Sequence, residues 1–267
     1  MAINPIVNSD FYLYFCNPFI SSKLPVLQTP RKITPDNLKD ALVVFKIVSD
    51  APDEALPGLF YSLLKSSLKE IPRESNPDFW SFGGSDGVHF KKREIVQFTS
   101  GNVKIQVIDN VLSFNLIGPY PGWDAYFPCI KEVLKHGFEA GYIQGVERIG
   151  LRYISELAGL SIFSSLKQPL VFLFPGGEGL NNTFKSELFG TDYTVVLNLA
   201  DNIVRRSVEL GAENFSLVDV DVFHQYSSPL QNIDLVLAET NRLHIIEKDV
   251  FFGILAPKFV QSRQPEY

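Results

Sequence analysis

The chain has 267 residues, of which 45% are hydrophobic and 20% charged, and its formal net charge is −6. This composition is typical of a globular protein with a substantial core and excludes an intrinsically disordered chain. The acidic balance argues against a broad nucleic-acid-binding surface, so nucleic-acid binding is kept only as a second alternative.

Cysteine content and hydropathy bear on the cellular compartment. Cys16 and Cys129 form no C-x-x-C pair, so neither a zinc site nor a redox motif is predicted, and both are expected to be free thiols. No basic residue precedes the apolar residues near the N-terminus, so no signal peptide is indicated. No segment approaches the ~20 apolar residues that a spanning helix needs. We expect a cytoplasmic protein with no membrane association.

The first 34 residues are rich in Pro, Asn and Ser. Pro18, Pro25 and Pro30 are spaced so that no long regular element fits between them. We expect residues 1–34 to form an N-terminal arm laid over the core, tied down by one short edge strand at 11–15.

Residues 35–157 alternate between strand and helix patterns. Residues 40–49 are β-branched and aromatic, as in a core strand, and a helix is predicted from Pro57 through Glu70. A helix from Trp123 to Gly141 follows a Pro-Gly turn. Further strands are predicted at 79–82, 88–90, 95–99, 103–108, 112–116 and 145–157, the first two flanking a glycine-rich hairpin loop at 83–87.

The same order, strands and then one long helix, recurs beyond Leu157. Strands are predicted at 170–174, 184–188, 193–199 and 215–224, followed by a helix from Asn232 to about Pro257. We therefore predict an α+β protein of two similar halves, 35–157 and 158–267, each an antiparallel sheet covered by helices. The strand at 145–157 bridges the two halves.

The strand at 145–157 carries two arginines on one face. Because side chains alternate across a strand, Ile149, Leu151 and Tyr153 face one side, and Arg148, Gly150 and Arg152 face the other. Two arginines beside a glycine that exposes backbone form a candidate site for a small anion or nucleotide. The alternative is a structural network in which the arginines form ion pairs with acidic residues of a neighbouring strand.

Asp219 and Asp221 are the acidic partners that such a network requires. They share one face of the strand at 215–224, with three valines on the other face, and they are candidates for a structural or a ligand-binding role. A catalytic carboxylate pair is disfavoured, because no companion motif accompanies them and His224 falls on the valine face.

No other pattern indicates catalysis. The four histidines have no metal-binding spacing, no G-x-S-x-G motif is present, and the glycine-rich loops at 83–87 and 175–179 lack the G-K-[ST] of a phosphate loop. We expect no metal, no cofactor and no catalytic residue. Trp123, at the start of its helix, is either a core residue or part of an aromatic platform for a ligand.

The run R-I-G-L-R-Y-I from Arg148 resembles the R-I-G-L-R-Y-I-N signature of a sporadically distributed family of uncharacterised prokaryotic proteins. Other pieces look similar to that family's layout: P-G-L-F-Y from Pro57, Y-P-G-W from Tyr120, L-V-D-V-D from Leu217, and the final helix with His244. Ser155 stands where the family has Asn, and the resemblance covers about residues 35–260. It implies a common fold and a prokaryotic intracellular setting, and the patchy distribution suggests a mobile defence or toxin–antitoxin context.

These patterns favour a non-catalytic binding or regulatory protein that acts through a partner protein. The alternative is a small-anion or nucleotide binder, or an enzyme acting on such a ligand, that uses Arg148 and Arg152. The observation that separates them is whether the arginine face packs against acidic strand residues or lines an open cavity.

Overall fold

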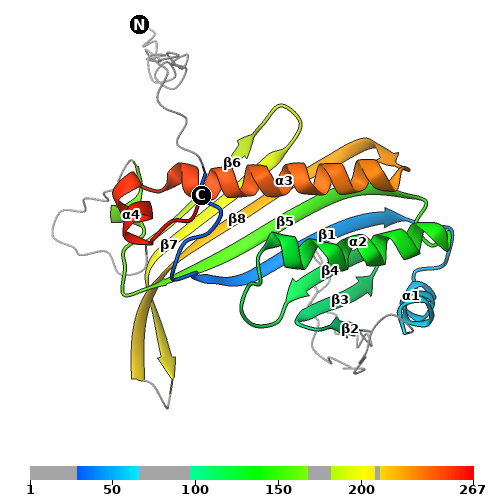
Figure 1. The fold of residues 1–267 in the computed structure, drawn as a ribbon, viewed down its shortest axis with the longest axis horizontal. Helices are drawn as coiled ribbons and strands as arrows, with labels where there is room; N and C mark the ends of the chain where they lie inside the picture. Colours follow the sequence, from blue (N-terminus) through cyan, green and yellow to red (C-terminus); the bar gives the residue numbers. More distant parts are fainter. Residues whose placement is uncertain (1–28, 66–96, 168–181, 208–210) are drawn as a thin grey trace, which may run out of the picture.

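The computed structural model describes residues 29–65, 97–167, 182–207 and 211–267 (Figure 1). Its strands are β1 (Leu38–Val48), β2 (Gln97–Ser100), β3 (Val103–Ile108), β4 (Val111–Leu116), β5 (Gly145–Ala158), β6 (Asn182–Phe189), β7 (Thr194–Ser207) and β8 (Gly211–Leu230). Its helices are α1 (Leu56–Leu64), α2 (Trp123–Glu139), α3 (Ile233–Ile254) and α4 (Pro257–Ser262), with a 3₁₀ turn at Phe163–Ser165.

All eight strands belong to one antiparallel sheet with the order β2-β3-β4-β1-β5-β8-β7-β6. At its centre β1 pairs with β5, from Leu38 opposite Ser155 to Val48 opposite Gly145. This pairing joins β1–β4 and β5–β8 into a single continuous sheet, and α2 and α3 lie across the same face of it (Figure 1). The prediction of an α+β protein with an antiparallel sheet and covering helices is confirmed.

The sheet turns one apolar face toward the helices. On β5, Ile149 and Leu151 are completely buried and Tyr153 is nearly so, whereas Arg152 on the opposite face is exposed. The strands on either side alternate in the same way, which is the pattern of a sheet with one covered and one open face. The buried positions of these strands make up most of the core: Val43, Phe45, Ile47, Ile105, Leu112, Phe114, Val218, Val220 and Val222.

The two long helices bury apolar stripes against this face. α2 begins after Gly122, whose φ of 92° lets the chain turn sharply from the Pro-Gly segment into the helix. α3 begins at an N-cap, because the side chain of Asn232 accepts a hydrogen bond from the backbone N of Asp234 at 2.7 Å. The buried stripe of α3 runs through Val236, Leu237, Thr240, Leu243 and Glu247, so it ends in a carboxyl group.

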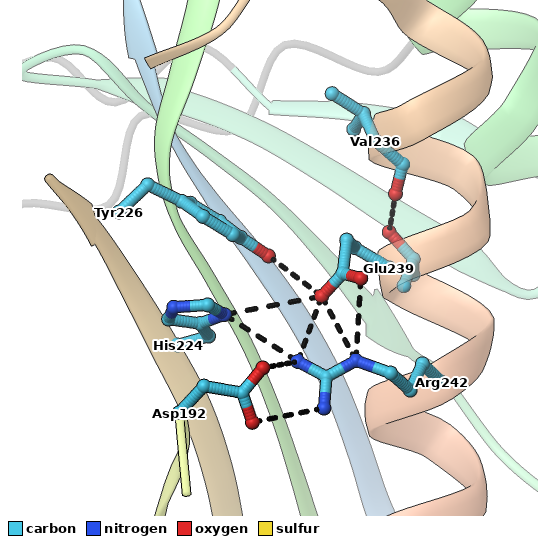
Figure 2. Close-up of polar contacts among 7 residues, drawn as sticks. Asp192, His224, Tyr226, Val236, Glu239 and Arg242 are labelled. Carbon is cyan, nitrogen blue, oxygen red and sulfur yellow. Dashed lines mark hydrogen bonds and ion pairs between the residues drawn. The ribbon is translucent and has the colours of Figure 1, made fainter. Parts of the chain in front are cut away.

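A cluster of polar side chains fixes the first half of α3 on β8 (Figure 2). Arg242 donates to Glu239 Oε2 at 2.8 Å and to Asp192 Oδ1 at 3.2 Å. From β8, the hydroxyl of Tyr226 donates to the same Glu239 oxygen at 3.4 Å, and His224 Nδ1 lies 3.4 Å from Arg242 Nη2. Because each group has a partner inside the cluster, we interpret it as a structural anchor for the helix.

Several predicted elements lie outside the described residues. These are the edge strand at 11–15, the hairpin around 83–87, the strand at 170–174 and the last residues of the helix predicted through Glu70. The described part of that helix is α1, Leu56–Leu64. The described end of the arm joins the C-terminal segment, since the backbone N of Thr34 donates to Arg263 O at 2.7 Å. Lys32 and Glu266 form an isolated β-bridge beside it.

Replacing Phe114 with Ala is expected to destabilise the fold strongly. Phe114 is completely buried and its ring meets that of Phe45 edge to face, with centroids 5.9 Å apart. A cavity at this position should lower the free energy of unfolding by about 3–5 kcal/mol, measured by urea denaturation. Phe189→Ala is the matched control, because Phe189 is 78% exposed and its loss should change the value by less than about 0.5 kcal/mol. Equal losses in the two variants would contradict this assignment of the core.

Candidate functional site

Arg152 lies on the open face of the sheet and is engaged by Asp219. Its Nε and Nη2 donate to the two Asp219 carboxylate oxygens at 2.9 and 2.8 Å, a bidentate ion pair between β5 and β8. Asn198 on β7 donates to the same carboxylate at 3.1 Å, and Asp219 is only 7% exposed. The cross-strand pairing that the sequence offered as a structural alternative is therefore present for these two residues.

Arg148 packs on an aromatic ring of the same face. Its guanidinium carbon lies 4.3 Å from the centroid of the Phe223 ring, a cation–π contact. Gly150 lies between them in the pleat: a Cβ at this position would stand 3.5 Å from both Arg148 Nη1 and Phe223 Cβ. Burial raises the pKa of Asp221, and the two arginines oppose that rise. The arginine face is thus packed against neighbouring strands, and none of these residues lines the cavity described next.

A hollow with a polar and aromatic lining lies on the helix side of the sheet. This interhelix cavity has a volume of about 680 Å³ and is bounded by the start of α2, the second half of α3, β5 and the segment before β1. Its aromatic lining consists of Tyr120, Trp123, Tyr153, His244, Phe251 and Phe252, and its other lining residues include Asn37, Ser155, Glu247 and Lys248.

Trp123 forms part of an aromatic stack at the edge of this cavity. Its ring is nearly parallel to that of His244, with an interplanar angle of 14° and centroids 4.1 Å apart, and it also stacks on Phe127. The indole N–H donates to Asn241 Oδ1 at 2.7 Å, which fixes the ring between α2 and α3. Trp123 therefore both packs against the core and lines the cavity. From the sequence, a core role and a ligand-binding role were alternatives.

Glu247 places a carboxyl group in the cavity wall without a partner. Its side chain is only 3% exposed, and none of the described residues gives it a hydrogen bond or an ion pair. Burial raises the pKa of Glu247 to about 8, because an ionised carboxylate is poorly solvated there, and the charge of Lys248 opposes this rise. Near neutral pH the carboxyl is therefore mostly protonated.

Three other polar groups of the cavity wall are also uncharged at neutral pH. Burial, assisted by Lys248, lowers the pKa of His244 to about 4, and burial raises the pKa values of Tyr120 and Tyr153 far above the ordinary range. The hydroxyl of Tyr153 lies 3.4 Å from His244 Nδ1 and 3.3 Å from the hydroxyl of Tyr120. These three groups form a short hydrogen-bonded chain along the cavity wall, and the wall can both donate and accept hydrogen bonds.

Only a weak signal for this site is present in the sequence. Tyr153 could be assigned to the covered face of its strand, but Glu247 and His244 were not selected as functional residues. The signal that was available is the position of Glu247, which follows Leu243 by four residues and so interrupts an apolar helical stripe with a carboxyl group. Which elements would meet at that point depends on contacts between residues far apart in the chain.

No known protein family, curated protein or solved structure matches this chain. The resemblance noted around Arg148 stays a prediction. In the part of the chain that the structure describes, no group of three or more His, Cys, Asp or Glu residues is placed to hold a metal ion. Among the described helices, none combines the length and the apolar character that crossing a membrane requires.

Arg152→Ala is expected to destabilise the protein more than Arg148→Ala. The first change leaves the buried Asp219 carboxylate without its bidentate partner, whereas the second removes only a contact with a ring. Solvent screens part of the ion pair, since the Arg152 side chain is 46% exposed. We therefore expect the free energy of unfolding to fall by about 1–2 kcal/mol in Arg152→Ala and by less than about 1 kcal/mol in Arg148→Ala. Urea denaturation measures both, and the opposite ranking would contradict the structural role of the pair.

Glu247→Gln is expected to flatten the pH dependence of stability between about pH 6.5 and 8. The pKa of this carboxyl is about 8 in the folded protein against an ordinary value of 4.5, so the folded state holds a proton that the unfolded chain has released. Stability from this group is complete below about pH 4.5 and is lost as the pH rises to about 8, by up to about 1.4 kcal/mol per pH unit. His244 acts in the opposite direction, but only below about pH 6.5.

The measurement is the free energy of unfolding at a series of pH values for the wild type and the variant. Glu266→Gln is the matched control, because Glu266 also lines the cavity but is exposed to solvent. It should keep the slope of the wild type. Identical slopes in the wild type and Glu247→Gln would show that the carboxyl is ionised in the folded protein.

Proposed function

We propose that this protein binds a small organic molecule in the interhelix cavity and that binding, without covalent chemistry, is its biochemical role. The observation that carries the proposal is the buried carboxyl of Glu247, which has no partner among the described residues and lies in a wall of aromatic side chains. A buried polar group without a partner is costly, and ligand sites are places where such a cost is retained.

The dimensions and lining of the cavity support a ligand of moderate size. Its volume of about 680 Å³ falls within the roughly 300–1,000 Å³ that is usual for small-molecule sites. Aromatic walls with a few polar groups at fixed positions are the usual lining of such sites. Here the stacked rings of Trp123 and His244 belong to the lining, and the hydroxyl groups of Tyr120 and Tyr153 lie 3.3 Å apart in the same lining.

The proposal is tested by screening a chemically diverse library for compounds that raise the melting temperature. The chain has two tryptophans, so in a Trp80→Phe variant the emission of Trp123 reports directly on occupancy of the cavity. We expect at least one compound class to stabilise the protein and to change this emission saturably at the same concentration.

Two serine variants locate the binding. Ser155 lines the cavity and is 5% exposed, so Ser155→Met should fill part of it and weaken binding at least about tenfold. Ser113→Met is the matched control, because Ser113 lies on the open face of β4, and it should leave the affinity unchanged. A library without any stabilising compound, or compounds that bind both variants equally well, would overturn the proposal.

A second candidate function is binding of a partner protein on the open face of the sheet. This face carries half-buried apolar side chains beside the ion pair of Arg152 and Asp219: Leu42, Val44, Ile154, Leu217 and Phe223. The mixture of apolar and paired charged groups is typical of surfaces that bind other proteins, and α2 and α3 lie on the other side (Figure 1). A partner bound here would agree with the regulatory role that the sequence favours.

Val44→Glu tests this second function, since a buried charge at the centre of the face should abolish binding. The expected result is that a partner recovered in fixed stoichiometry from the native host is lost in Val44→Glu but retained in Leu235→Glu, where the changed residue lies on an exposed part of α3. Recovery of the protein alone, or equal recovery of the partner with both variants, would remove the support for this surface.

We also infer that the chain consists of two equivalent halves. The strand order supports this, because β1-β4-β3-β2 and β5-β8-β7-β6 run outward from the central pair in the same succession. Each set of four strands is followed by one long helix, α2 or α3. In this arrangement the second half begins at β5 instead of after it, and the interhelix cavity lies where the helices of the two halves meet.

A further inference from the structure

We propose that the ligand of the interhelix cavity carries a positively charged nitrogen on an apolar body and that the Glu247 carboxyl is its counter-ion. This inference rests on the proposed binding function and specifies the chemical class of the ligand. It stands on the position of Glu247, on the aromatic lining and on the arrangement of charges around the cavity.

The aromatic lining favours a cation. The face of an aromatic ring carries negative electrostatic potential, so clustered aromatic rings attract ammonium and guanidinium groups more than they attract neutral or anionic groups. The cavity is lined by Tyr120, Trp123, Tyr153, Phe251 and Phe252, which come from α2, β5, α3 and the turn before α2. A cation that leaves water for this site enters a cavity with five aromatic residues in its lining.

The carboxyl of Glu247 supplies the compensating charge. A buried cation is tolerated when an opposite charge is close to it, and the same is true of a buried carboxylate. In the described part of the chain no arginine, lysine or histidine lies within ion-pair distance of Glu247, although Lys248 is its neighbour in sequence. A cationic ligand would therefore pair with a group that has no partner among the described residues.

Other charged groups also line the cavity. Arg31 and Asp124 form an exposed ion pair of 2.7 Å at the start of α2. Because Asp124 lies in the first turn of α2, its carboxylate also interacts favourably with the positive end of the helix dipole. His244 is neutral at physiological pH. The titratable and charged groups that line the cavity around Glu247 are Arg31, Lys32, Asp36, Tyr120, Asp124, Tyr153, His244, Lys248 and Glu266.

A second unpartnered group lies in the same wall. Asn37, just before β1, lines the cavity, and its side-chain Nδ2 is buried without a hydrogen-bond acceptor. An oxygen acceptor on the ligand would satisfy it. The site thus suits a molecule with a cationic nitrogen and a carbonyl, ether or hydroxyl oxygen.

Three aromatic probes, two of them of nearly the same shape, test the charge preference. Phenyltrimethylammonium has a permanent positive charge, tert-butylbenzene is its neutral counterpart, and benzoate is an aromatic anion. Dissociation constants are measured through Trp123 emission in the Trp80→Phe variant. We expect the cation to bind at least about tenfold more tightly than either of the other probes.

The pH dependence connects this preference with Glu247. The charge of the probe does not titrate, so its affinity follows ionisation of the carboxyl and should rise about tenfold per pH unit up to about pH 8, then level off. Glu247→Gln, which keeps the shape of the protonated side chain, should remove both the pH dependence and the preference for the cation. Glu266→Gln, which changes an exposed residue of the cavity lining, should retain the pH dependence and the preference for the cation.

The outcomes separate this inference from the proposed function. Equal binding of the cation and the neutral probe, tighter binding of benzoate, or a pH dependence that survives in Glu247→Gln would overturn the cationic assignment and leave small-molecule binding intact. Failure of all three probes to change the emission of Trp123, together with a library that yields no stabilising compound, would overturn both.

Discussion

The pairing of β1 with β5 is the interaction on which the rest of the structure depends. It joins strands that are more than ninety residues apart in their register, for example Phe45 with Ile149, and thereby merges two sets of four strands into one sheet. Both strands are central, so each is hydrogen-bonded on two edges and buried on its helix side. The long helices can share one covered face only because this seam keeps the face continuous.

The same seam divides the molecule into two chemically different faces. On the open face, the arginines of β5 are engaged by Asp219 and Phe223 and stabilise the contact between neighbouring strands. On the covered face, the start of α2, the second half of α3 and β5 bound a cavity of about 680 Å³. A single strand therefore contributes Arg152 to an ion pair and Tyr153, the next residue, to a candidate ligand site.

The cost of burying Glu247 links stability with function. An unpartnered carboxyl on the apolar stripe of α3 lowers stability as the pH rises toward 8, because the folded protein must hold a proton or bury a charge. In the polar cluster around Arg242 and Glu239, by contrast, each charged group has a partner of opposite charge (Figure 2). The charges on the first half of α3 are thus paired, whereas the carboxyl on its second half has no partner among the described residues.

The sequence by itself determined the local elements and the faces of the strands. Alternation placed Ile149, Leu151 and Tyr153 on the covered side and Arg152 on the other, and helical periodicity found α2 and α3, because these patterns depend on near neighbours in the chain. Only the tertiary structure decided that the strands form one sheet and that Asp219 engages Arg152 and not Arg148. It alone brought Trp123, Tyr153, His244 and Glu247 around one cavity, since the packing of α2 against α3 over β5 is fixed by contacts between distant segments.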